Sequence, residues 1–304
     1  MSLKNMIKNN LSKMPYIRAL VSENKKLKQF SMFPPGHFYS PIVDTNNIEK
    51  SKSEIWKERT PTEIHGISFN DDAQRTLLGK LAQFYDDLPF EDTKQPGLRY
   101  YYKNKFYSYT DAIVLFGMLR HLKPKRVIEI GSGFSSAIML DTNELFFDNK
   151  IQLSFIEPYP ERLRSLMTEK DSKTSKVYET FIQQVDTSIF TELEAGDIVF
   201  VDSSHIVKTG SDVNFILFEI LPLLKKGVFI HFHDIFYPFE YPEKWVMKGF
   251  NWNEDYFLRA FLMYNDAFEI ALFSHYLHKR HPKAFTNMPL AYQSTGGNLW
   301  LRKT

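Results

Sequence analysis

The sequence predicts an α/β fold, in which strands and helices wind into a mostly parallel seven-stranded sheet that an antiparallel pair completes. Three observations support this fold class. Helix-like and strand-like segments alternate from Asp111 onward, which is typical of a wound sheet. An apolar run ends in a turn with glycines at 131 and 133. Two further apolar runs lie close together at the end of the chain.

The elements follow in order from Asp111. A helix is expected over 111–121, where apolar residues share one face until Lys123-Pro124 ends it. Short apolar runs predict buried strands over 126–130, 151–156, 179–185, 197–201 and 227–231. Helices are expected over 161–169 and 213–224, and the antiparallel pair over 268–273 and 298–302. Five wound strands and the terminal pair make the seven strands expected of a Rossmann-like sheet.

Residues 1–100 have a different sequence pattern, with many prolines and no clear alternation of apolar and polar residues typical of strands. We expect them to form an N-terminal extension that serves as a lid, a substrate-binding region or an oligomer contact, ahead of a catalytic domain over 101–304. Homo-oligomerisation is left open. The first residues hold no continuous apolar stretch, so we expect neither a secretion signal nor a membrane span, and a cytoplasmic protein.

Composition narrows the function classes. With 304 residues, of which 43% are hydrophobic, the chain can bury a sizeable core. A net charge of +2 gives no support to a nucleic-acid partner. The chain contains no cysteine, which excludes disulfides, thiolate metal sites and a cysteine nucleophile.

The segment 126–137, RVIEIGSGFSSA, predicts a ligand-binding turn. Gly131 and Gly133 allow the backbone to bend and to approach a ligand closely, and a helix starting near Ser135 would direct its N–H groups at that ligand. The spacing G-x-G-x-x-S lacks the third glycine of the dinucleotide fingerprint. The turn therefore favours a cofactor with an adenosine and no pyrophosphate over NAD.

Acidic residues at strand ends indicate how such a cofactor would be held. Glu157 follows the second strand, where a carboxylate accepts ribose hydroxyls; the alternative is a glutamate that caps the next helix. Asp186 follows the third expected strand and would take the adenine amino group or form an ordinary turn or N-cap. Glu129 lies within the first strand, and a buried carboxylate needs partners. Turn N–H groups or a cofactor ammonium are the natural ones, which favours a cationic sulfonium over a pyrophosphate.

The motifs EIGSGFSS, FIEP, FVDSSH and HFHDIF together resemble the class I S-adenosylmethionine-dependent methyltransferases, and more narrowly methyltransferase family 24. The resemblance covers roughly residues 101–304, and PPGHFYSPIVD at Pro34–Asp44 resembles a segment ahead of the catalytic domain in relatives. It implies that S-adenosylmethionine is the cofactor. It further implies that Glu129 and the Gly131–Gly133 turn hold its methionine part and that Glu157 holds its ribose.

Polar residues after the fourth and fifth strands predict the reacting centre. Asp202 and His205 follow one strand, His233 and Asp234 the other, and both strands end at the rim where the cofactor is expected. In one hypothesis Asp202, His233 and Asp234 hold Mg²⁺ or Mn²⁺, which activates the acceptor hydroxyl. In the other, His205 or His233 removes the proton without a metal. Purely structural roles remain a third possibility.

The sequence thus predicts an S-adenosylmethionine-dependent O-methyltransferase that acts on a sugar hydroxyl or a related small polar metabolite, free or within a glycan. Asp202, His205 and His233 are the expected catalytic residues. The cofactor would be bound by Glu129, Gly131, Gly133, Ser135, Glu157, Asp186 and Asp202. Two alternatives are an NAD-dependent oxidoreductase, which the missing glycine and Glu129 disfavour, and a non-catalytic protein that binds an adenosyl ligand with the same fold.

Overall fold

The structure is a computed structural model, which describes residues 14–57, 61 and 63–304. It divides into two compact units. The described parts of Met1–Arg59 form one unit together with Pro242–Asn251, and those of Thr60–Tyr241 form the other together with Trp252–Thr304. The domain boundary expected near residue 100 stays a prediction. The role expected of residues 1–100 stays a prediction.

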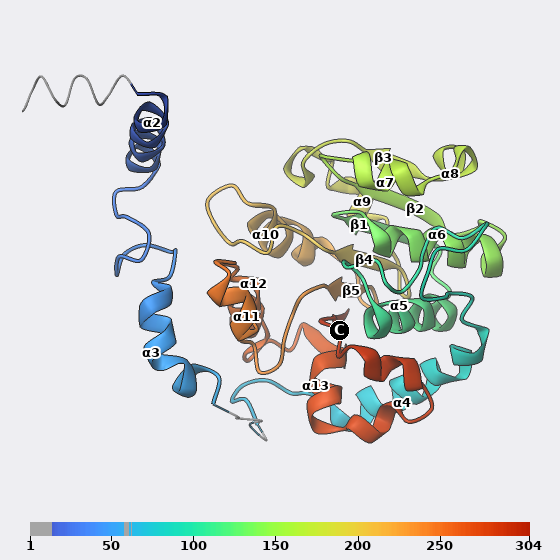
Figure 1. Cartoon of the computed structure of the whole chain (residues 1–304). Coiled ribbons are helices and arrows are strands. Elements are labelled where there is room, and N and C mark those ends of the chain that lie inside the picture. Colours follow the sequence, from blue (N-terminus) through green and yellow to red (C-terminus); the bar gives the residue numbers. More distant parts are fainter. Residues whose placement is uncertain (1–13, 58–60, 62) are drawn as a thin grey trace, which may run out of the picture. The chain divides into compact units, whose positions relative to one another are not determined.

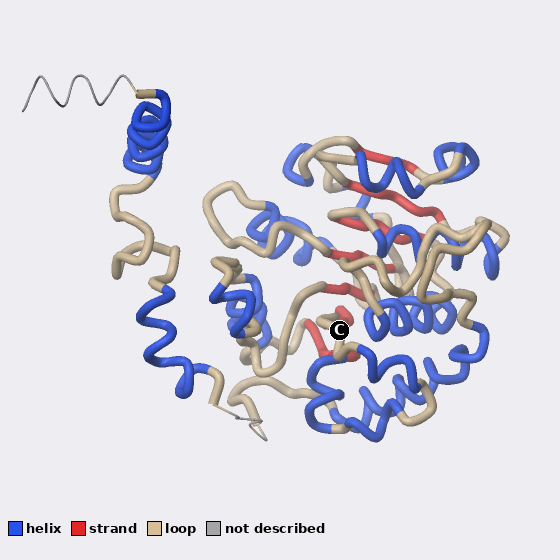
Figure 2. The backbone as a smooth tube through the Cα atoms, viewed as in Figure 1, coloured by secondary structure: helices blue, strands red, loops and turns tan. Residues whose placement is uncertain are grey.

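The larger unit is built on a seven-stranded sheet in the order β3-β2-β1-β4-β5-β7-β6, drawn in red in Figure 2. The strands are β1 Arg126–Ile130, β2 Gln152–Ile156, β3 Lys176–Tyr178, β4 Ile198–Val201, β5 Phe229–Phe232, β6 Phe268–Phe273 and β7 Leu299–Lys303. Strands β1 to β5 pair in parallel, whereas β7 is antiparallel to both β5 and β6. The predicted fold class is therefore confirmed.

Helices of the larger unit flank this sheet (Figure 1). They are α4 Asp71–Leu81, α5 Tyr109–Leu122, α6 Phe134–Phe147, α7 Glu161–Leu166, α8 Glu169–Thr174, α9 Ser188–Thr191, α10 Asp212–Phe215, α12 Glu254–Leu262 and α13 Ser274–Arg280. The chain continues from α10 through a π-helical turn at Ile216–Ile220 and a 3₁₀ turn at Leu221–Leu223. The smaller unit contains α2 Pro15–Phe30, α3 Thr45–Ile55 and α11 Glu243–Met247. Among the helices described, none has the length and apolar character needed to cross a membrane.

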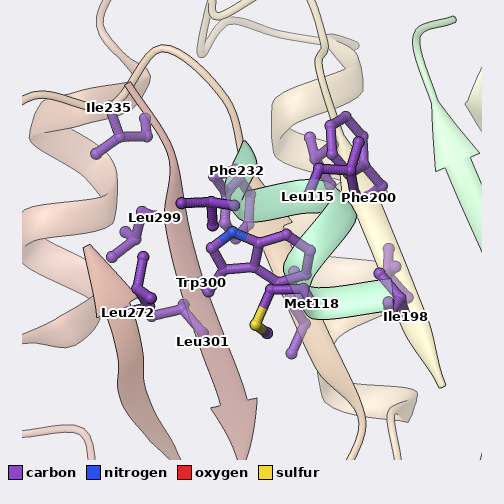
Figure 3. Close-up of a cluster of buried hydrophobic side chains, with 14 of the residues drawn as sticks. Leu115, Met118, Ile198, Phe200, Phe232, Ile235, Leu272, Leu299, Trp300 and Leu301 are labelled. Carbon is purple, nitrogen blue, oxygen red and sulfur yellow. The ribbon is translucent and has the colours of Figure 1, made fainter. Parts of the chain in front are cut away.

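The core lies where α5 packs against the centre of the sheet. Leu115 and Met118 of α5 reach towards Trp300 of β7, which is fully buried, and Phe200 of β4 lies close by (Figure 3). Strand β4 is buried along its whole length, because a parallel strand at the centre of a sheet has both faces covered. This burial explains why its sequence, IVFV, shows no alternation of polar and apolar residues.

The third strand was predicted too late in the sequence. Strand β3 covers Lys176–Tyr178, whereas most of the predicted segment 179–185 is a loop with a 3₁₀ turn at Ile182–Gln184. Apolar residues in this segment do not extend the sheet. Ile182 is buried and, like Phe181, lines a cavity. An apolar run alone does not distinguish such a loop from a buried strand.

The predicted helix over 161–169 is divided in two. Met167 has an extended backbone, and the Thr168 side chain caps a new helix, α8, by accepting a hydrogen bond from the backbone N–H of Asp171.

A buried arginine joins residues ahead of α5 to the helices beside β1 and β2. Arg99 is buried, and its guanidinium forms ion pairs with Asp141 at 2.7 Å, Asp171 at 2.7 Å and Glu144 at 2.8 Å. The backbone N–H groups of Arg99 and Tyr100 also donate to the Asp141 carboxylate. The guanidinium thus serves two buried carboxylates and the part-exposed Glu144, which also pairs with Lys170 at 2.8 Å.

Candidate active site

Backbone hydrogen bonds continue the sheet by one residue beyond three of its strands. Gly131 N–H donates to the carbonyl of Ile156, and Asp202 N–H donates to the carbonyl of Ile130. Glu157 N–H donates in the same way to the carbonyl of Tyr178. The residues that follow β1, β2 and β4 are therefore fixed side by side at one edge of the sheet.

The first glycine of the turn is required by close packing. Gly131 has a φ of +82°, and a Cβ added there would lie 1.7 Å from the carbonyl oxygen of Asp202. The second is different: Gly133 has an extended backbone, with φ at −174°. A Cβ on Gly133 would meet the Arg162 Cδ atom at 3.4 Å, which is an ordinary contact. Only Gly131 is needed for the approach of the β1 end to the β4 end.

Two cavities of about 670 Å³ and 380 Å³ lie beside this turn, and both are lined by Gly131, Glu157, Asp202, Ser203 and Ser204. The structure thus brings most of the predicted site residues together. Those that line one or both cavities are Gly131, Gly133, Ser135, Glu157, Asp202, His205, His233 and Asp234.

Glu157 is held between the two cavities by backbone donors. Its Oε2 atom accepts a hydrogen bond from Ser132 N–H at 3.0 Å, and its Oε1 atom accepts one from Tyr159 N–H at 2.8 Å. A carboxylate has further acceptor positions on both oxygens. Glu157 is therefore oriented by the turn and still able to accept hydroxyl groups from a ligand.

Part of the lining of the larger cavity is aromatic. The rings of Tyr159 and Phe181 line it, with centroids 6.1 Å apart and planes at 87°. The amide side chains of Gln183 and Gln184 lie beside them. The sequence pointed to Asp186 instead, because the third strand was expected to end there. Asp186 lines neither cavity; its carboxylate accepts a hydrogen bond from Ser188 N–H at 2.9 Å, which is the alternative turn role.

Glu129 lies behind the turn, fully buried, and lines neither cavity. Its partners are the hydroxyls of Ser135, at 2.6 Å, and Ser136, both in the first turn of α6. These hydroxyls, and not the turn N–H groups, are the partners of Glu129 that the structure shows. Burial raises the pKa of Glu129 to about 8, although both hydroxyl hydrogen bonds act to lower it. Glu129, in β1, thus holds the first turn of α6 in place.

Beside the smaller cavity, two imidazoles flank two carboxylates. His205 Nε2 lies 3.5 Å from Asp202 Oδ1 and 3.8 Å from Asp234 Oδ2. His233 Nδ1 approaches the same two oxygens at 3.4 Å and 3.7 Å. His205 and Asp234 both have left-handed backbones, with φ of +59° and +58°, a conformation that non-glycine residues adopt mainly where the surrounding structure imposes it.

A further carboxylate faces the outer nitrogen of each imidazole. Glu254 Oε2 lies 2.8 Å from His205 Nδ1, and Asp111 Oδ2 lies 3.8 Å from His233 Nε2. Sequence reasoning missed both residues. Glu254 opens α12 and follows no strand or motif, so nothing local marks it. Asp111 begins the apolar run of α5, and a single acid before such a run is the one signal that would have drawn notice.

These contacts set the charges of the site. Burial alone would lower the pKa of His205, but the carboxylates of Asp202 and Glu254 raise it to about 10. Asp234 and Asp202 likewise raise the pKa of buried His233 well above its usual value. Burial acts to raise the pKa of Asp202, yet the two imidazoles hold it well below its ordinary range. At neutral pH the ligand-free site therefore contains two imidazolium ions around an ionised Asp202.

This arrangement does not fit the predicted Mg²⁺ or Mn²⁺ site. Within residues 14–57, 61 and 63–304, no group of three His, Asp or Glu side chains has the geometry to hold a metal ion. Asp202, His233 and Asp234 form ion pairs with one another instead.

The different roles of the two glycines give a first prediction. Gly131→Ala should destabilise the protein by about 2–4 kcal/mol, or prevent folding, because its Cβ clashes with the β4 end in a left-handed conformation. Gly133→Ala is the matched control and should cost less than about 1 kcal/mol, since no such clash exists. Urea unfolding of both variants measures these costs; equal losses would contradict the packing argument.

Glu129 gives a second prediction, on stability against pH. The folded chain holds a proton up to about pH 8 that an unfolded carboxyl releases near its ordinary pKa of 4.5. The contribution of the protonated carboxyl to the stability of the fold is fully present below pH 4.5 and is lost as the pH rises towards 8. In the ligand-free protein, the free energy of unfolding of wild type should therefore fall by about 2–4 kcal/mol more over this pH range than that of Glu129→Gln. Thermal unfolding between pH 5 and 9 tests it, with Glu269→Gln, at a surface ion pair, as control. Parallel profiles of wild type and Glu129→Gln would refute it.

Comparison with known proteins identifies the larger unit. The model of a family described as "Methyltransferase domain", methyltransferase family 24, matches residues 128–235, a stretch that contains the glycine turn and every predicted site residue. An uncharacterised protein of the archaeon Archaeoglobus fulgidus is 35% identical over 167 residues, which are 54% of this chain and 74% of that protein.

Two solved structures are also similar in part. An S-adenosylhomocysteine-bound methyltransferase of Podospora anserina has 17% identity and a TM-score of 0.40, with 86% of this chain and 97% of that one covered. The O-methyltransferase TomG of Streptomyces achromogenes, solved with S-adenosylmethionine, has 14% identity and a TM-score of 0.38, with 86% and 96% covered. At these TM-scores neither likeness carries an argument about the site. By its family model, the larger unit contains a methyltransferase domain of family 24, and the chain belongs to the class I S-adenosylmethionine-dependent methyltransferases.

Proposed function

We propose that this methyltransferase moves the methyl group of S-adenosylmethionine to a hydroxyl of a sugar or a related small polar acceptor. The adenosine would occupy the larger cavity, and the sulfonium would face the smaller one. One observation carries the proposal: Asp202 lines both cavities and lies 3.5 Å from His205. A carboxylate and an imidazole thus stand where the methyl group and the acceptor would meet.

Features of the turn support an adenosyl cofactor and disfavour a dinucleotide. In a dinucleotide site the turn N–H groups contact the pyrophosphate. Here Ser132 N–H is already donated to Glu157, which suits a ribose beside a carboxylate and not a phosphate. The aromatic pair Tyr159 and Phe181 would enclose the adenine. A sulfonium in the smaller cavity would be stabilised by the carboxylates of Asp202 and Asp234.

Chemistry at this site needs little beyond alignment and one proton acceptor. The acceptor oxygen attacks the methyl carbon, the carbon–sulfur bond breaks with its electron pair going to sulfur, and the hydroxyl proton leaves to a base. His205 is the proposed base, because Glu254 fixes its Nδ1 atom while its Nε2 atom faces Asp202 and Asp234. A nearby sulfonium lowers the pKa of an imidazolium by repulsion, which is the direction that base catalysis requires.

The walls of the smaller cavity support a polyhydroxylated acceptor. Asp202 and Asp234 offer carboxylate oxygens, which accept hydrogen bonds from adjacent hydroxyls. Trp252 lines the same cavity. Aromatic faces beside carboxylates suit the apolar faces and hydroxyl edges of a sugar ring.

Calorimetric titration with S-adenosylmethionine, S-adenosylhomocysteine and NAD tests the cofactor. We expect both adenosyl ligands to bind, with or without EDTA, and Glu157→Gln to weaken them by about tenfold or more through the loss of charged hydrogen bonds to the ribose. Formation of S-adenosylhomocysteine with a panel of mono- and disaccharides tests the transfer. Preference for NAD would overturn the proposal, and adenosyl binding without turnover on any hydroxylated acceptor would favour the non-catalytic alternative.

Glu254 should act through His205 as a positioning residue. Glu254→Gln and His205→Asn should each lower kcat by about 10–100-fold, and the double variant should be no slower than the slower single variant, because the two side chains act as one unit. The Kd for S-adenosylhomocysteine should change less than threefold in each. Glu269→Gln serves as control. Multiplicative losses in the double variant would separate the two roles.

A further inference from the structure

A single arginine stands at the wall of the smaller cavity. Arg162 is the second residue of α7, and its guanidinium carbon lies 4.0 Å from the centroid of the Phe106 ring. Both residues line this cavity together with Ser132, Gly133 and Ser135 of the glycine turn. The Arg162 side chain also lies close to the turn itself, since a Cβ on Gly133 would meet its Cδ atom at 3.4 Å.

The charge of Arg162 has no acidic partner in the described part of the chain. Its neighbour in α7, Arg164, which is exposed like Arg162 itself, forms an ion pair with Glu179 at 2.6 Å. For Arg162 the structure records the Phe106 ring as the contact of its guanidinium. An aromatic ring on the face of a guanidinium leaves the N–H groups at its edge free for a planar anion such as a carboxylate.

A second feature of the same wall favours an anion. Helix α6 runs from Phe134 to Phe147 and begins where the turn ends, so its positive dipole end faces the space beside Arg162. Glu157 occupies only the Ser132 N–H group of this region. A carboxylate placed between Arg162 and the start of α6 would meet a cation and the positive end of a helix together.

The proposed function brings such a carboxylate to this place. With the adenosine in the larger cavity and the ribose at Glu157, the amino-acid part of the cofactor extends along the Gly131–Gly133 turn into the smaller cavity. We therefore propose, resting on that function, that Arg162 binds the α-carboxylate of the methionine moiety and that Phe106 holds the guanidinium in place for it. An anionic group on the acceptor is the competing source of the same chemistry.

Two ligands separate the amino-acid part from the nucleoside. S-adenosylhomocysteine carries the carboxylate, whereas 5′-methylthioadenosine keeps the adenosine and thioether and lacks the whole amino-acid part. In calorimetric titrations, Arg162→Gln should raise the Kd for S-adenosylhomocysteine about tenfold or more and leave that for 5′-methylthioadenosine within twofold. Arg162→Lys, which keeps the charge and loses the planar fork, should fall between wild type and Arg162→Gln. Arg164→Gln is the matched control in the same helix and should change neither Kd.

Other outcomes have distinct meanings. If Arg162→Gln leaves the Kd for S-adenosylhomocysteine unchanged, the inference is overturned, and a raised KM for the acceptor in that variant would assign Arg162 to the acceptor. An equal loss for both ligands would likewise contradict a specific carboxylate contact. If wild-type protein binds neither ligand, the proposed function itself fails, and the inference fails with it.

Discussion

Where β1 ends, the backbone of Gly131 comes so close to the carbonyl of Asp202 that no side chain fits between them. This approach determines the geometry of the whole site. It lets the turn after β1 and the residues after β4 share both cavities, with Glu157 bound to the same turn from the side of β2. The site thus depends on one backbone contact before any side-chain chemistry.

Beside that contact, carboxylate and imidazole side chains alternate in a row. Glu254, His205, Asp202, His233 and Asp111 follow one another at distances between 2.8 and 3.8 Å, with Asp234 facing both imidazoles. Each imidazole thus has a carboxylate within 4 Å of both of its nitrogens, and Asp202 remains ionised although its pKa would rise on burial alone. In the proposed function, these fixed carboxylates would meet the cationic sulfonium without reorganisation.

The sequence predicted those parts of the site that local pattern controls. Buried parallel strands read as apolar runs, and residues after such strands meet at one edge, so Glu157, Asp202 and His233 could be grouped in advance. The rest depends on contacts between distant segments. Glu254 reaches His205 from a helix 49 residues later, and no periodicity signals this meeting. Asp186 was misplaced because an apolar run such as 179–185 occurs in loops as well as in strands. Strand β3 ends earlier than expected, and Phe181 and its neighbours therefore line the cavity. The cation at Arg162 was overlooked because α7 reads as an ordinary surface helix.

The guanidinium of Arg99 has a consequence for where the catalytic domain begins. Any fragment starting after this residue would retain Asp141 and Asp171 as buried anions facing each other without their common cation. Two such charges in an apolar setting repel one another and oppose the packing of α6 beside the sheet. The segment ahead of α5 is therefore an integral part of the larger unit's fold, because it supplies the cation that α6 and α8 share.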